Sequence, residues 1–280
     1  MELTVLHQTT YRYDTPVGQI ALLLRLQPPQ LNCQTPRDWQ VSVNGEPVST
    51  FHANGFGDSE AFFQQRRPVR ELSIVASGSV ETSDRHGVVS GFRQEAPLPV
   101  FLRQTDLTRP DAAIRAFAQS VVGPDPLGRL HALSGLVREV ISYRPGSTST
   151  ASTAAEALAQ GQGVCQDHTH LFVSAARVLG IPARYVAGYL LADDASQALR
   201  ETHAWAEAWV EGLGWLGFDA TNGLCVTDHY VRLCCGLDAQ EAAPVRGSAF
   251  GATATATAVQ ADVMINETRP DAAQQNQQQQ

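Results

Sequence analysis

A glycine-broken loop that runs directly into an amphipathic helix is the feature that most restricts the fold of this chain. The loop is Gly161-Gln162-Gly163, whose glycines permit a close backbone approach. The helix is predicted over residues 165–179, because Gly180 and then Pro182 form a helix stop. Cys165 therefore falls in the first turn, where unpaired N–H groups and the positive end of the helix dipole favour a thiolate. A small buried cysteine also suits this position, so the partners of the thiol decide its role.

A nucleophilic thiol needs a base within hydrogen-bond reach and a third group that orients the base. The alternating residues 203–210 predict a strand that begins at His203. After a turn, residues 215–221 predict the returning strand, with Asp219 near its end. Each of these two side chains has an ordinary structural explanation when taken alone. Together with Cys165, they form a candidate catalytic set.

The length of that turn decides whether the histidine and the aspartate meet. A strict two-residue loop places Asp219 opposite Ala206, and His203 then points to the other face of the sheet. A triad therefore requires a longer turn or a bulge. We predict such an irregularity between Ala208 and Gly217.

Four segments resemble the transglutaminase-like superfamily, a papain-related group with a Cys-His-Asp triad. The resemblance implies that Cys165 is the nucleophile, His203 the base and Asp219 the orienting group. It extends from about residue 2 to about residue 265 and is similar to bacterial members with their own N-terminal β-domain. Two positions depart from the family pattern: His168, where relatives mostly carry an aromatic residue, and Ala220, where proline is common. The segments that carry the resemblance are residues 163–167, 181–189, 203–207 and 214–221.

The fold class predicted from these patterns is α+β, with a papain/transglutaminase-like core of helices packed on an antiparallel sheet. Residues 1–95 alternate as strands and predict an all-β, sandwich-like N-terminal domain. A proline-bearing linker then leads to a catalytic domain at residues 100–265, which includes further C-terminal strands. Residues 266–280 form a glutamine-rich tail that is predicted to be disordered. Within the catalytic domain, helical periodicity covers residues 110–122, 126–143 and 152–160.

Composition narrows the classes of partner. The 280 residues have a net charge of -8, which argues against nucleic acid and anionic membranes as partners. No run approaches the roughly 18 apolar residues of a transmembrane helix, and residues 1–7 do not read as a secretory signal. The sequence thus predicts a cytoplasmic protein that acts on a peptide or protein substrate.

Cysteine and histidine spacing gives no sign of a disulfide framework, a metal site or a cofactor. The five cysteines are scattered, and Cys234 and Cys235 are adjacent, which strains any bridge between them. His168 and His170 are two residues apart on a predicted helix, so they face different directions and do not chelate one ion together. All 20 basic residues are arginine, so an amine acceptor for acyl transfer comes from another molecule.

The chemistry predicted for this set is acyl transfer on an amide bond through a thioester on Cys165. The backbone N–H of Cys165 is the natural first donor to the oxyanion, and Gln160 and Gln162 are candidate side-chain donors. Hydrolysis by a peptidase or amidase is favoured over transglutaminase chemistry, because amine transfer needs a second binding site that outcompetes water. A non-catalytic scaffold and a metal-dependent hydrolase that uses the histidines are the competing hypotheses.

Overall fold

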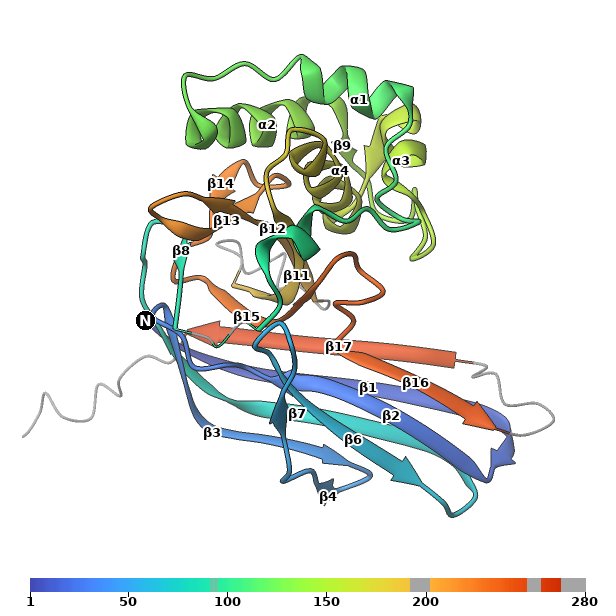
Figure 1. Cartoon of the computed structure of the whole chain (residues 1–280). Coiled ribbons are helices and arrows are strands. Elements are labelled where there is room, and N and C mark those ends of the chain that lie inside the picture. Colours follow the sequence, from blue (N-terminus) through green and yellow to red (C-terminus); the bar gives the residue numbers. More distant parts are fainter. Residues whose placement is uncertain (92, 94, 192–201, 251–257, 268–280) are drawn as a thin grey trace, which may run out of the picture.

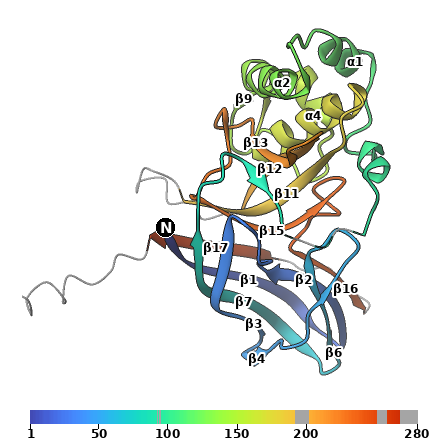
Figure 2. The ribbon, with the colours of Figure 1, turned by 60° about the vertical axis from the view of Figure 1, so that its left-hand side comes forward.

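The computed structural model describes residues 1–91, 93, 95–191, 202–250 and 258–267, without the side chains of residues 258–262. Two stacked parts form the molecule: a β-sandwich, and above it a layer of helices on an antiparallel sheet (Figure 1). A second view shows the same two parts from another side (Figure 2). The predicted α+β class and the all-β N-terminal domain are confirmed. No helix in the described part of the chain combines the length and the apolar character needed to cross a bilayer.

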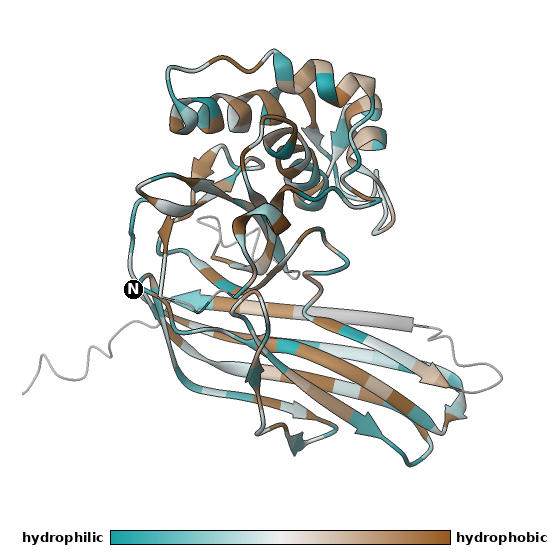
Figure 3. Cartoon of the chain, in the orientation of Figure 1, coloured by the Kyte–Doolittle hydropathy of each residue, from teal (hydrophilic) through white to brown (hydrophobic). Residues whose placement is uncertain are grey.

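The β-sandwich forms because its strands alternate apolar and polar residues, so each sheet buries one face. Figure 3 shows this alternation along the strands, and β1 buries every second residue from Leu3 to His7. One sheet has the order β17-β1-β7-β3-β4 and the other β16-β2-β6-β5. The strands are β1 (Glu2–Val17), β2 (Gln19–Gln27), β3 (Gln34–Val43), β4 (Glu46–Pro47), β5 (His52–Ala53), β6 (Ser59–Gln65), β7 (Val69–Thr82), β16 (Val245–Phe250) and β17 (Ala258–Glu267).

The two C-terminal strands belong to this sandwich, which corrects the predicted domain at residues 100–265. β17 pairs antiparallel with β1, and β16 pairs antiparallel with β2. The pairing satisfies backbone groups of β1 and β2 that would otherwise form open sheet edges. Alternation in the sequence identified the strands but not their partners. Residues 266 and 267 end β17, and the remainder of the predicted tail lies outside the described residues.

The second part is a sheet of order β14-β13-β12-β11-β15 with β8 paired to β13, and helix α4 packs against β11 and β12. Helices α1, α2 and α3 surround α4, and they confirm the three predicted helical segments with shorter bounds. The helical elements are the 3-10 helix η1 (Leu98–Leu102), α1 (Ala112–Gln119), α2 (Pro126–Val140), α3 (Ala154–Gln160) and α4 (Cys165–Val178). The strands are β8 (Val88–Val89), β9 (Ser142–Tyr143), β10 (Gln162–Gly163), β11 (Ala183–Leu190), β12 (His203–Val210), β13 (Gly214–Asp219), β14 (Leu224–Cys225) and β15 (Tyr230–Gly236).

A buried chain of charges joins the two parts. Arg232 on β15 contacts Asp58 of the sandwich at 2.5 Å and Glu207 on β12 at 3.0 Å. Glu207 also accepts a 2.7 Å hydrogen bond from Arg184, whose guanidinium lies 4.0 Å from the Trp215 ring centroid. Burial alone would raise the pKa of Glu207, but Arg232 and Arg184 hold it below its usual value. Glu207 therefore stays charged between the two arginines.

Breaking this chain of charges is expected to destabilise the fold. Asp58→Ala leaves the buried Arg232 with one carboxylate fewer, and loss of one partner of a buried pair costs about 3–5 kcal/mol. Urea unfolding followed by tryptophan fluorescence measures the change. The control is Glu71→Ala, which removes the exposed ion pair between Arg12 and Glu71 and is expected to cost less than about 1 kcal/mol. Equal losses in the two variants would contradict this interpretation.

A second buried contact between the two parts involves a neutral histidine. His7 on β1 has Nδ1 2.7 Å from the Tyr189 hydroxyl and Nε2 2.9 Å from the Thr9 hydroxyl. Burial lowers the pKa of His7 to about 4. Between pH 6.5 and 4, His7 therefore stays neutral in the folded protein, whereas the same histidine in the unfolded chain, with a pKa of about 6.5, becomes protonated.

Stability is consequently expected to fall as the pH drops from about 6.5 towards 4. In that window the unfolded state binds a proton that His7 in the folded state does not, which favours unfolding by up to about 1.4 kcal/mol per pH unit. Glutamine does not titrate in this range. His7→Gln is therefore expected to lower the slope of the unfolding free energy against pH by up to about 1.4 kcal/mol per pH unit, the contribution of one proton. An unchanged slope would contradict the assignment.

Candidate active site

Cys165 is the first residue of α4, in the first turn as predicted, and it is half-buried. Gly161, with a φ of +67°, ends α3 in the left-handed conformation, and the chain then turns through β10 into α4. At the first helical position the backbone N–H has no acceptor within the helix. The predicted junction therefore exists, and it presents the thiol beside a free N–H donor.

Asp167 holds this junction together. Its buried Oδ2 accepts from the backbone N–H of Val164 at 2.8 Å and from the Thr148 hydroxyl at 2.6 Å. A Cβ added to Gly163 would lie 2.6 Å from the Asp167 Cβ, so only glycine leaves room for this cap. The sequence predicts a close backbone approach just before Cys165. In the structure, the backbone of Gly163 lies close to the side chain of Asp167.

The turn between β12 and β13 has three residues, 211–213, and the ladder beyond it is regular. Gly212 has a φ of +82°, a conformation that glycine adopts without strain. In this register Ala206 lies opposite Phe218, and Asp219 follows on the face that carries His203. The predicted irregularity is therefore present as a longer turn, and no bulge is required.

His203 and Asp219 meet at the end of this hairpin. The distance from His203 Nε2 to Asp219 Oδ2 is 2.7 Å, and Asp219 is fully buried. Burial acts to raise the pKa of Asp219, but the hydrogen bond from His203 and those of its other partners keep the pKa below its usual value. The other donors to the carboxylate are the Tyr230 hydroxyl at 2.8 Å, the Asn222 side-chain amide at 2.7 Å, and the backbone N–H groups of Thr221 and Asn222.

A side-chain hydrogen bond also joins His203 to Cys165. Because Asp219 occupies Nε2, Nδ1 is the nitrogen left for the thiol. Burial acts to lower the pKa of His203, but the bonds to Asp219 and Cys165 together raise it to about 10. The structure thus places all three predicted side chains in one chain of hydrogen bonds, with the imidazole held as a cation.

Sequence reasoning missed Tyr230 and Asn222 as partners of the carboxylate. Asn222 lies in an Ala-Thr-Asn-Gly run that indicates a turn, and turn asparagines often bond to nearby groups. Tyr230 is the first residue of β15, and no local pattern links that strand to Asp219. Its ring also lies 6.1 Å from the His203 ring, so one tyrosine contacts both members of the pair.

The two glutamines proposed as oxyanion donors make other contacts. The Gln160 side chain donates to the Ser147 carbonyl at 3.3 Å, and the Gln162 side chain accepts from Arg144 at 3.2 Å. A role for either glutamine at the oxyanion stays a prediction.

Both histidines of α4 are buried among backbone groups. His168 has its ring nitrogens 2.9 Å from the carbonyl oxygens of Val164 and Ile141. His170 accepts from the Ala239 N–H at 3.1 Å, and burial lowers its pKa to about 4. In the described part of the chain, no three histidine, cysteine or acidic side chains are gathered for a metal. The five cysteines are free.

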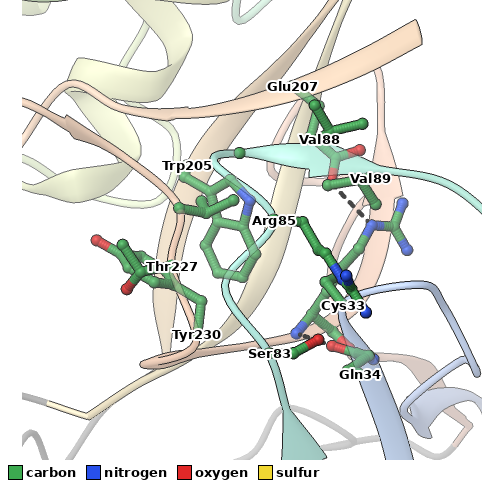
Figure 4. Close-up of a pocket in the computed structure, with 13 residues that line it drawn as sticks. Cys33, Gln34, Ser83, Arg85, Val88, Val89, Trp205, Glu207, Thr227 and Tyr230 are labelled. Carbon is green, nitrogen blue, oxygen red and sulfur yellow. Dashed lines mark hydrogen bonds and ion pairs between the residues drawn. The ribbon is translucent and has the colours of Figure 1, made fainter. Parts of the chain in front are cut away.

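A small cavity of about 20 Å³ lies between the two parts of the molecule (Figure 4). Trp205 and Tyr230 line it from the upper sheet, and Cys33 and Gln34 line it from the sandwich side. Its volume accepts about one water molecule. Since neither Cys165 nor His203 lines it, this cavity is not where a substrate meets the thiol.

Comparison with known proteins identifies the family. Residues 115–220 match the transglutaminase-like superfamily, and residues 3–81 match the bacterial transglutaminase-like N-terminal region. An uncharacterized protein of Mycobacterium leprae is 30% identical over 280 residues, covering 95% of this chain and 98% of the relative. One from Mycobacterium tuberculosis is 29% identical over 269 residues, covering 87% and 86%. The chain therefore belongs to the transglutaminase-like superfamily.

A solved structure shares the whole architecture. It is the crystal structure of a "putative cysteine protease" from Cytophaga hutchinsonii, with a TM-score of 0.72 and 21% sequence identity. The match covers 97% of this chain and 92% of that chain. At this identity the likeness shows a shared fold only. The shared fold includes both the β-sandwich and the part with the helices.

Asp219→Asn is expected to slow alkylation of Cys165 by iodoacetamide at pH 6 by about tenfold or more, because the imidazolium loses its charged partner. Peptide mass spectrometry measures the modified fraction of each cysteine over time. In the wild type, Cys33 and Cys225 serve as internal references, since burial raises the pKa of both thiols, that of Cys33 to about 11. Asp228→Asn, a partly exposed carboxylate beside the N-terminus, is the matched control and should react like the wild type.

Proposed function

We propose that this protein catalyses cysteine-dependent acyl transfer on amide or peptide bonds, with Cys165 as nucleophile, His203 as acid and base, and Asp219 as the group that orients His203. The observation that carries the proposal is the position of His203. It bonds on one side to the fully buried Asp219, at 2.7 Å, and on the other side to the half-buried thiol. Membership of a superfamily with enzymes of this kind supports it.

The proposed reaction proceeds in two steps. The Cys165 sulfur attacks the carbonyl carbon, a tetrahedral oxyanion forms, and the carbon–nitrogen bond breaks as His203 gives its proton to the leaving amine. Water then attacks the resulting thioester and passes a proton to His203. The carbon–sulfur bond breaks, an acid leaves, and the thiolate–imidazolium pair is restored.

Asp219 supports both steps by holding one tautomer and one orientation of the ring. Five hydrogen bonds converge on its carboxylate, three from side chains and two from backbone N–H groups. A buried carboxylate with this many donors stays ionised, and it stabilises the imidazolium across the ring. Such a network is costly to build around a histidine that never changes charge, which favours an enzyme over a non-catalytic scaffold.

Hydrolysis is the favoured fate of the thioester, and a peptide or protein is the favoured substrate. Water needs only access to the half-buried thiol, whereas an amine acceptor needs a binding site of its own. The chain has no lysine, so it offers no side-chain amine to itself. Transglutaminase activity remains the alternative reaction for the same thioester. A cytoplasmic location stays a prediction.

The reaction type is tested by incubating the protein with a glutamine-containing peptide and a primary amine at millimolar concentration, followed by mass spectrometry. We expect hydrolysis products to exceed amine adducts, and Cys165→Ala to abolish both. Cys225→Ala, which removes another half-buried thiol, is the control and should keep full activity. Dominant amine adducts would reject hydrolysis in favour of transglutaminase chemistry. Products that survive in Cys165→Ala would reject the proposed nucleophile.

A further inference from the structure

The proposed oxyanion needs a second hydrogen-bond donor. The N–H of Cys165 supplies the first, because it begins α4 and has no acceptor within the helix. The side chains of Gln160 and Gln162 bond to Ser147 and Arg144 instead. A donor that lies near the thiol and has no other partner fits this role better.

Tyr185 lies in the required place. It sits on β11 opposite Ala206, so its side chain is on the sheet face against which α4 packs. Its ring lies 5.2 Å from the ring of His170 on α4, and Cys165 packs against the apolar cluster that contains Tyr185. The side chain is thus fixed under the first turns of the cysteine helix, with only 5% of the residue exposed.

The Tyr185 hydroxyl makes no hydrogen bond with any described residue, and it is not one of the fully buried polar atoms left unpaired. Tyr189, four residues later on the same face, bonds to His7 at 2.7 Å. The Tyr185 oxygen therefore keeps a small exposed area, where an arriving group can reach it. A phenol without a partner in this part of the molecule can donate a hydrogen bond to a group that arrives with the substrate.

Electrostatics keeps this phenol protonated. Burial raises the pKa of Tyr185 well above its ordinary value, and the charge on Cys165 raises it further. The hydroxyl therefore lies close enough to sense the thiolate, yet within the described structure it makes no hydrogen bond to the sulfur.

We propose that the Tyr185 hydroxyl is the side-chain donor that, with the Cys165 N–H, stabilises the oxyanion during acyl transfer. This assignment rests on the proposed function of Cys165. The phenol gives a hydrogen bond as negative charge develops on oxygen and keeps its own proton. It acts on the tetrahedral intermediate and not on the free thiolate.

Two reactions of the same thiol separate these roles. Acylation by p-nitrophenyl acetate passes through a tetrahedral oxyanion, whereas alkylation by iodoacetamide displaces iodide at a saturated carbon and forms none. Tyr185→Phe is expected to slow the acylation burst by about 100-fold, the scale of a lost oxyanion donor. The alkylation rate of Cys165 at pH 6 should change less than twofold, which also shows that the variant is folded. Tyr189→Phe, the matched control, should keep both wild-type rates.

Equal acylation rates in Tyr185→Phe and the wild type would overturn the assignment. A parallel loss of acylation and alkylation would also overturn it, because the tyrosine would then act on the thiol or on the fold. The proposed function fails separately if wild-type protein is acylated no faster than Cys165→Ala, and the Tyr185 assignment fails with it.

Discussion

The fully buried carboxylate of Asp219 is the group on which the proposed chemistry depends. A charge in that position is tolerated only because donors from three segments surround it: His203 on β12, the residues after β13, and Tyr230 on β15. The same arrangement fixes the imidazole against Cys165 and raises the pKa of His203 to about 10 despite its burial. A buried carboxylate thus favours the protonated form of the imidazole that faces Cys165.

Asp219 reaches this position because the turn between β12 and β13 is one residue longer than a two-residue hairpin turn. Between β12 and β13 the turn has three residues, and a turn of two would move the carboxylate to the opposite face. Below the site, the chain Arg184, Glu207, Arg232 and Asp58 ties the sheet that carries His203 to the sandwich. Strands β16 and β17 return to that sandwich and pair with β2 and β1, so segments from both halves of the sequence form the support of the sheet that carries the candidate site.

Local patterns in the sequence predicted the local parts of this arrangement. The glycine loop, the cysteine helix and the hairpin each leave a short-range signal in the sequence. Because side chains alternate between the two faces of a strand, the sequence also showed that a two-residue turn would place His203 and Asp219 on opposite faces. Contacts between distant segments left no such signal: Tyr230 donates to Asp219, Cys165 packs against the apolar cluster that contains Tyr185, and β17 pairs with β1. Alternation identifies a strand but does not specify its partner, so β16 and β17 were assigned to the wrong domain.

The protonation of His203 tests the central claim most directly. Nuclear magnetic resonance of ¹⁵N-histidine-labelled protein, with His203→Gln used to assign the signal, reports the charge of this imidazole as the pH is varied. The account predicts that His203 stays doubly protonated through neutral pH and titrates near 10. Titration at or below the ordinary histidine value of about 6.5 would contradict a thiolate–imidazolium pair held by Asp219.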